Sequence, residues 1–177
     1  TINFTRSNTM TAEEMRQVAI KLVSVIPESV KTDTLTERDK KDFFLADHEN
    51  LAKVQERLSA KERINSKTGE KLSEGDLYAK YVKKVTDEEI AYDADTELAA
   101  KLYKRMNATS NFATTIIASG NFTAEQQATI AENERSFKGI SVGTTWEREY
   151  AASPLTSILG TVTSEKTGIP AEDLDDY

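Results

Sequence analysis

The sequence predicts an α+β domain, in which a small mixed sheet built from both chain ends receives a helical insert. Three observations predict this fold. Short β-branched and aromatic segments occur towards both ends, apolar residues at helical spacing fill the stretch between them, and capping signals recur where helices would start. We expect the sheet subdomain over residues 1–10 and 107–163, the helical insert over 11–106, and a linker over 164–177.

The opening segment predicts a strand followed by a capped helix. Ile2–Phe4 is β-prone. Thr11 and Glu14 then have the spacing of a capping box, in which each side chain accepts a hydrogen bond from a backbone amide that the helix leaves free. Pro27 is expected to end this helix, because proline has no amide hydrogen to donate. The apolar residues at helical spacing are Met15, Val18, Ala19, Leu22 and Ile26.

The stretch from residue 36 to residue 104 has helical character. Apolar residues after each capping signal fall on one face, which is typical of an amphipathic helix. The polar segment Glu62–Lys71 interrupts the series and predicts an exposed loop. No repeat of 20–50 residues is present, which argues against a helical solenoid. The predicted helix caps are Thr36, Asp47, Ser73 and Asp95.

After the helical stretch the pattern changes to short strands and turns. Phe112–Ile117 is β-branched and aromatic and predicts a strand, which Gly120–Asn121 turns. After the capping boxes at Thr11–Glu14 and Thr36–Asp39, a third at Thr123–Gln126 starts another helix. This helix is expected to run towards Phe137 and to stop at Gly139, since glycine is the usual residue just past a helix end.

The last third of the chain predicts more sheet. Residues 140–146 alternate between apolar and polar, the pattern of a half-buried strand, and Trp146 is expected in the core or at a subdomain interface. Residues 153–160 predict a short helix that begins at Ser-Pro and ends at Gly. Residues 161–163 predict a final strand.

Composition restricts the classes of function. The 177 residues carry a net charge of −7, so phosphate backbones are repelled and nucleic acid is not expected as a partner. The chain has no cysteine, which excludes thiol nucleophiles, disulfides and the usual structural zinc sites. No apolar run reaches the roughly 18 residues that a membrane helix needs. Any membrane anchor is therefore expected upstream of Thr1.

No constellation of residues predicts a metal or cofactor site. His48 is the single histidine and lies in the polar run Asp47-His48-Glu49, where we expect an exposed helix junction. Asp93-x-Asp95 lacks the glycine and distal glutamate of a calcium loop. The acidic runs are interpreted as helix N-terminal acids, which the helix dipole favours. A small hydrolase built on His48 and nearby acids stays an alternative hypothesis.

Three short triplets match serine acyl-enzymes of the penicillin-recognising type. They are Lys67-Thr68-Gly69, Lys166-Thr167-Gly168 and Ser119-Gly120-Asn121. Those enzymes also need a serine with lysine three positions later, because an ordinary serine hydroxyl is too weak a nucleophile without activation. No serine in this chain has lysine at that position. We therefore predict no catalytic residue and interpret the triplets as coincidences.

Residues 139–173 carry a resemblance to a known family. Gly139–Val142, Trp146–Tyr150 and Ser157–Val162 resemble the stretch of class B penicillin-binding proteins in which a strand with Arg-x-Tyr precedes a short helix and a strand with Leu-Gly-x-Val. The continuation, Thr163–Asp173, is similar to the 2B type of low-GC Gram-positive bacteria. Supporting similarity to the same region runs upstream through Leu45–Asn50, Met106–Ala108 and Phe112–Thr114. The likeness is strong over residues 106–177 and looser over residues 1–105.

The resemblance implies a non-catalytic dimerisation or pedestal region. The parent would be a membrane-anchored serine D,D-transpeptidase, with an anchor helix before Thr1 and its transpeptidase domain beyond Tyr177, on the extracytoplasmic face. The implied partners are that domain, a membrane-embedded peptidoglycan glycosyltransferase and other wall-synthesis proteins; self-association is left open, and no cofactor is implied. The family motif residues, expected to be structural, are Arg148, Tyr150, Leu159, Gly160 and Gly168.

One position departs from the family pattern, and one alternative identity stays open. Ala151 follows Tyr150 where the family usually has proline, which puts the local turn in doubt. The alternative is a stand-alone extracytoplasmic protein-interaction module with the same acidic, cysteine-free composition. A stop codon soon after Tyr177 would favour it.

Overall fold

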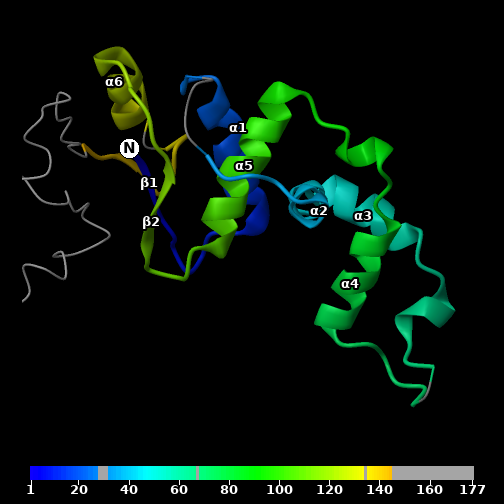
Figure 1. The fold of residues 1–177 in the computed structure, drawn as a ribbon. Helices are drawn as coiled ribbons and strands as arrows, with labels where there is room; N and C mark the ends of the chain where they lie inside the picture. The colour runs from blue at the N-terminus through cyan, green and yellow to red at the C-terminus, as the bar shows by residue number, and fades with distance from the viewer. Residues whose placement is uncertain (28–31, 67, 134, 145–177) are drawn as a thin grey trace, which may run out of the picture. The chain divides into compact units, whose positions relative to one another are not determined.

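The computed structural model describes residues 1–27, 32–66, 68–133 and 135–144. All of them except Thr144 belong to one unit, Thr1–Gly143 (Figure 1). In chain order the elements are β1 (Ile2–Thr5), α1 (Ala12–Val23), α2 (Glu37–Leu45), α3 (His48–Glu56), η1 (Ala60–Arg63), α4 (Glu74–Lys84), η2 (Glu88–Ile90), α5 (Ala94–Ala108), β2 (Thr114–Ala118), α6 (Ala124–Glu132) and β3 (Ile140–Val142).

The three described strands form one sheet in the order β2-β1-β3. Ile2 pairs with Ala118 on one side and with Val142 on the other, so the opening strand is central. The α+β fold and the pairing of the opening strand with residues 140–142 are confirmed. Both pairings are antiparallel, whereas a mixed sheet was expected. The predicted continuation to Trp146, and the helix and strand over residues 153–163, lie outside the described residues.

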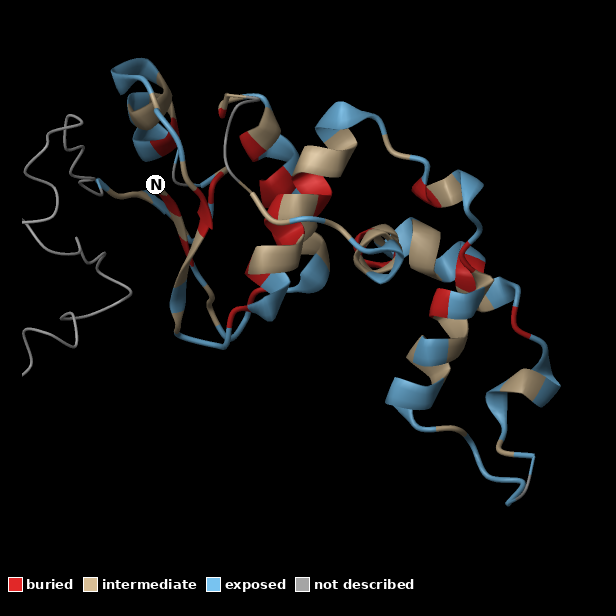
Figure 2. Cartoon of the chain, viewed as in Figure 1, coloured by how far each residue is buried: buried red, intermediate tan, exposed pale blue. Residues whose placement is uncertain are grey.

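The sheet core is the larger of two hydrophobic clusters and joins residues of β1, β2, α1, α5 and α6. Ile2 and Phe4 point to one face of β1 and are completely buried, whereas Thr5 is exposed, as the two-residue period of a strand requires. Figure 2 shows buried segments on β1, α1 and α5. α1 and α5 pack against each other, and α5 also packs against β2, so the two helices and the sheet share this core.

The helical lobe comprises α2, α3, η1, α4 and η2. Its smaller cluster has five buried residues, with Phe44, Leu51, Tyr78, Tyr81 and Tyr92 packed partly buried against it. α2 contributes to both clusters, because Phe43 packs into the sheet core and Leu45 into the lobe. The five buried residues are Leu45, Val54, Val82, Val85 and Ile90.

Helix caps follow local sequence closely. The three predicted capping boxes are present, with Thr11, Thr36 and Thr123 as N-caps. Asp47 and Ser73 also cap the helices predicted to follow them. The predicted cap at Asp95 is wrong. Asp93 is the N-cap of α5, because its carboxylate accepts from the amide of Thr96 at 2.8 Å, and Asp95 therefore lies in the first turn.

Two further element boundaries differ from the prediction. β2 begins at Thr114, because Phe112 has a φ of +64° and belongs to a turn. α6 ends at Glu132, and Phe137 reaches the sheet core from the turn that follows the helix. Gly139 therefore does not end a helix. Its φ is +79° where the chain closes against β1, and its carbonyl accepts from the amide of Thr5 at 2.8 Å.

Candidate functional site

His48 lies where the sequence predicts, at an exposed helix junction. It is the first residue of α3, and its side chain is 76% exposed. Nδ1 of His48 contacts the carboxylate of Glu13, so the imidazole joins the start of α3 to α1. An exposed histidine beside a carboxylate of a neighbouring helix fits a surface pairing better than a water-excluded catalytic group.

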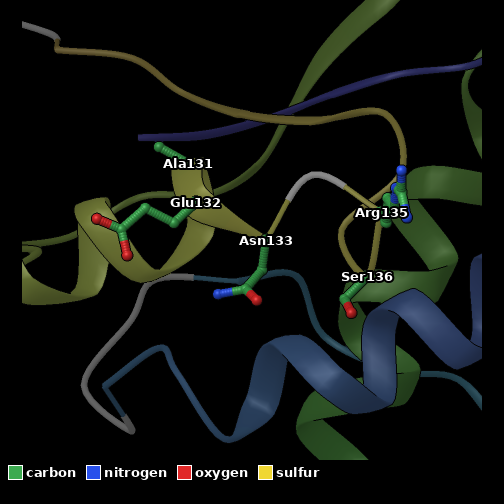
Figure 3. Close-up of a pocket in the computed structure, with 5 residues that line it drawn as sticks. All are labelled: Ala131, Glu132, Asn133, Arg135 and Ser136. Atoms are coloured by element: carbon green, nitrogen blue, oxygen red, sulfur yellow. The ribbon is translucent and has the colours of Figure 1, made fainter.

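A shallow hollow of about 340 Å³ lies at the turn after α6 (Figure 3). Ser136 is the hydroxyl residue among those that line it, and Figure 3 shows Asn133 between it and the carboxylate of Glu132. A serine needs an adjacent base to act as a nucleophile. Gly139, rather than lysine, lies three positions after Ser136, so the hollow lacks the pair that acylation requires. The lining residues are Ala131, Glu132, Asn133, Arg135 and Ser136.

The acidic runs of the described residues serve as caps and ion-pair partners. Glu89 accepts from the amide of Thr86 at 2.9 Å and pairs with the Arg57 guanidinium, with Nη2 to Oε1 at 2.6 Å. Arg57 is the main reason that the pKa of Glu89 falls to about 2. Among the described residues, no group of three or more His, Asp or Glu side chains is arranged to hold a metal ion.

The predicted structural motif lies beyond the part of the chain that the structure describes. Trp146 lies there too. The motif residues outside the described ranges are Arg148, Tyr150, Leu159, Gly160 and Gly168.

At the end of the sheet where β1 starts, the structure fixes the first residues of the chain beside residues 142 and 143. The amide of Gly143 donates to the carbonyl of Thr1 at 2.9 Å, and Ile2 is in register with Val142. The backbone that enters the sheet and the backbone that leaves it are therefore bonded side by side. Because Ile2 is buried in the sheet core, this end of the sheet is held by packing as well as by hydrogen bonds.

A junction of aromatic rings joins the sheet core to the helical lobe. The ring of Phe43 meets Tyr92 and Tyr103 edge to face, with centroids 5.7 and 5.5 Å apart. The Arg16 guanidinium lies 5.0 Å from the Phe43 ring centroid, and its Nη1 contacts Asp47 at 2.8 Å. Burial raises the pKa of Tyr103 to about 12.

Ion pairs reinforce the same junction on the side of α5. Arg105 contacts Asp33 through Nε and through Nη2, the latter at 2.7 Å, and the Arg105 hydrogen bond lowers the pKa of Asp33. Lys104 contacts Asp39 at 2.9 Å and donates to the carbonyl of Thr34 at 2.8 Å. Adjacent residues of α5 therefore hold the segment that leads into α2.

Sequence reasoning missed three features of the structure. The Asp33–Arg105 ion pair joins residues far apart in the chain, and no local sequence pattern predicts it. A fourth capping box, Ser59 with Glu62, could have been found from its spacing. Phe112 was assigned to a strand, although it is an exposed turn residue.

One further finding concerns membranes. In the described part of the chain, no helix combines the length and the apolar character that a membrane span requires.

Comparison with known proteins gives consistent results along the chain. A family model described as the penicillin-binding protein dimerisation domain matches residues 1–177. The chain is 39% identical over 176 residues to penicillin-binding protein 2B of Streptococcus pneumoniae serotype 2. This match covers 99% of the present chain and 25% of that protein. It is 34% identical over 179 residues to penicillin-binding protein 2A of Bacillus subtilis strain 168, of which it covers 24%.

A solved structure supports the same grouping. Penicillin-binding protein 2B from S. pneumoniae strain 5204 matches with a TM-score of 0.65 and 36% identity, over 99% of this chain and 27% of that one. The chain thus spans about a quarter of the length of the relatives that it matches. The predicted resemblance is confirmed, and the chain belongs to the penicillin-binding protein dimerisation domain family.

Proposed function

We propose that this chain is the non-catalytic pedestal of a membrane-anchored peptidoglycan D,D-transpeptidase. In this role it positions the penicillin-binding domain for cell wall synthesis at the extracytoplasmic face of the membrane, with the anchor helix upstream of Thr1. The family match supports the proposal, and so does the share of the relatives' length that the chain covers. About three quarters of such a relative remains for an anchor and a catalytic domain.

The observation that carries the proposal is the bonding of Thr1 to Gly143 at one end of the sheet. A pedestal must hold the polypeptide after it at a defined position relative to the polypeptide before it. Antiparallel pairing of β1 with β3 does this, because each strand can move only with the other. The buried side chains of β1 extend the constraint to α1 and α5.

The proposed partners follow from the same role. They are the parent's own transpeptidase domain, a membrane-embedded peptidoglycan glycosyltransferase and other wall-synthesis proteins. The net charge of −7 argues against nucleic acid. The domain boundaries and the structural role of Arg148, Tyr150, Leu159, Gly160 and Gly168 are part of the proposal, and self-association can be tested by sedimentation.

Covalent labelling with a fluorescent penicillin tests the proposal. The purified chain is expected to form no adduct, whereas the full-length protein is expected to form one that survives denaturation. An adduct on the isolated chain would overturn the pedestal function. An open reading frame that stops soon after Tyr177 would instead favour the stand-alone interaction module.

A further inference from the structure

Phe112 is the most exposed large hydrophobic side chain in the described part of the protein. It is 75% exposed, compared with 39% for Ile20 and 40% for Ile64. Single exposed apolar residues are common, so exposure alone assigns no role. The backbone and the surroundings of Phe112 supply two independent observations.

The backbone of Phe112 is in the left-handed region, with a φ of +64°. Phe112 is the third residue of a turn that the amide of Ala113 closes on the carbonyl of Ser110 at 3.1 Å. This turn position favours glycine or asparagine, and a bulky residue there is an outlier. The ring is exposed, so it gains no burial within this unit that could offset the backbone strain. An outlier of this kind is a reason to look for function.

The turn is held firmly against the end of β1. The amide of Phe112 donates to the carbonyl of Arg6 at 2.8 Å, and the amide of Arg6 donates to the carbonyl of Ala113 at 3.1 Å. The Arg6 guanidinium donates to the carbonyls of Asn107 and Thr109, at the end of α5. The ring is therefore presented by a turn with a defined conformation.

The two chain segments joined at this turn, residues 6–9 and 107–113, carry no charged side chain apart from Arg6. Residues 7–9 and 107–113, here called the Phe112 tip, contain no Asp, Glu, Lys or Arg, in a chain with 30% charged residues. Arg6 joins the two segments through the bonds just described. An aromatic residue in an uncharged surround is typical of the centre of a protein–protein interface.

The Phe112 tip lies at the far end of β1 from Thr1 and Gly143. Figure 1 shows the loop between α5 and β2 at the opposite end of β1 from the N label. Thr1 and Arg6 are five residues apart along the strand, so the two ends are separated by about 17 Å at roughly 3.3 Å per residue. Polypeptide that leaves the sheet at Gly143 can therefore reach the tip with a few extended residues.

We propose that Phe112 anchors a contact between the Phe112 tip and the transpeptidase domain that follows this region in the parent. This inference rests on the proposed function. One exposed ring and its polar surround are too small for free association, since a stable interface buries roughly 1,200 Å² or more. A tethered partner needs less area, because the linker gives it a millimolar effective concentration. The relatives are about four times as long as this chain, and this extra length provides the tethered polypeptide.

Thiol labelling of an Asn111→Cys variant tests the contact. Asn111 is exposed and adjacent to Phe112, and the chain has no native cysteine. The variant is made in this chain and in the full extracytoplasmic protein, with any cysteine outside this region replaced by serine. Labelling is expected to be at least about tenfold slower in the longer protein. An Ile64→Cys control, in the helical lobe, is expected to react at the same rate in both.

A second substitution separates Phe112 from its neighbours. Asn at position 112 suits the left-handed backbone and removes the ring, so Phe112→Asn is expected to keep or raise the melting temperature of this chain. Added to Asn111→Cys, it is expected to restore fast labelling in the longer protein.

Three outcomes would overturn the inference. They are equal labelling in the two proteins, protection that persists after Phe112→Asn, and protection in this chain that grows with its concentration, which would indicate a second copy instead. Each is independent of the penicillin-labelling test, because none of them measures adduct formation by this chain.

Discussion

The sheet core and the helical lobe reach their folds by different means. The sheet core collects completely buried side chains from elements more than a hundred residues apart, such as Phe4 and Ile117. The smaller cluster of the lobe has five buried side chains, and the lobe adds polar contacts between its helices, among them Arg57 with Glu89 and Tyr78 with Asp42. Burial is the larger stabilising term, so the sheet core is expected to be the more rigid platform and the lobe the more adjustable part.

The largest effect is expected from Phe4→Ala in the sheet core. Phe4 lies in the central strand and is completely buried, so removal of the ring leaves a cavity that fixed neighbours cannot fill. The free energy of unfolding should fall by about 3–5 kcal/mol, as measured by urea denaturation. A loss below about 1 kcal/mol would contradict the idea that this cluster holds the unit together.

Substitution of two glycines, one in each region, compares the backbone constraints of the two regions. Both Gly139 and Gly69 have positive φ, but a Cβ on Gly139 would lie 2.6 Å from the Thr5 carbonyl oxygen, whereas one on Gly69 meets nothing within 4 Å. Gly139→Ala should therefore cost about 2–4 kcal/mol, because strain and a clash add, and Gly69→Ala about 1–2 kcal/mol from strain alone. Thermal unfolding of the two variants measures the difference, and equal costs would mean that Thr5 yields freely.

Val54→Ala tests whether the lobe unfolds separately. Val54 is completely buried in the lobe cluster, and the loss of two methyl groups should cost about 1–2 kcal/mol. We expect faster amide hydrogen exchange in α3 and α4, while the amides of β1 and α5 keep their protection. If exchange rises equally in both regions, the comparison fails and the unit opens as a whole.

Acid is expected to loosen the lobe before the sheet core. Arg57 lowers the pKa of Glu89 from 4.5 to about 2, so the folded state favours the ionised carboxylate. The stabilisation is complete above pH 4.5 and disappears as the pH falls towards 2. NMR signals of the Val54 methyl groups should shift over this range.

The Glu89→Gln variant provides the control for the acid effect. It should remove most of the pH-dependent shift and lower the free energy of unfolding at pH 7 by less than about 1 kcal/mol. An unchanged shift in this variant would assign the acid response to other carboxylates, such as Glu62, whose pKa is also lowered to about 2, chiefly by Lys84.

Local signals in the sequence predicted helix starts well and helix ends poorly. The boxes at Thr11, Thr36 and Thr123 were predicted because the cap and its partner are three residues apart. The end of α6 was misplaced because Phe137 fits a helical pattern locally but reaches the sheet core only from a turn. Tertiary burial, which no window of residues shows, decided that boundary.

The candidate site was also predicted only in part, because local sequence patterns do not show tertiary contacts. The alternation of apolar and polar residues predicts the strand from Ile140, and the β-prone segments near both ends of the chain predict their pairing. The left-handed turn at Phe112 was missed, because glycine or asparagine usually marks such a turn. The junction of Phe43 with Tyr92 and Tyr103 depends on how helices pack, which apolar spacing alone does not specify.

The central place of β1 has a consequence for biosynthesis. The strand is made first, yet its two neighbours, β2 and β3, are made more than a hundred residues later. Its hydrogen-bonding edges therefore stay open while most of the domain emerges, and loop closure over this separation makes folding slow. A nascent chain with Ile2 and Phe4 unpaired is vulnerable to aggregation, so the domain should depend on a holding chaperone until residue 142 has emerged.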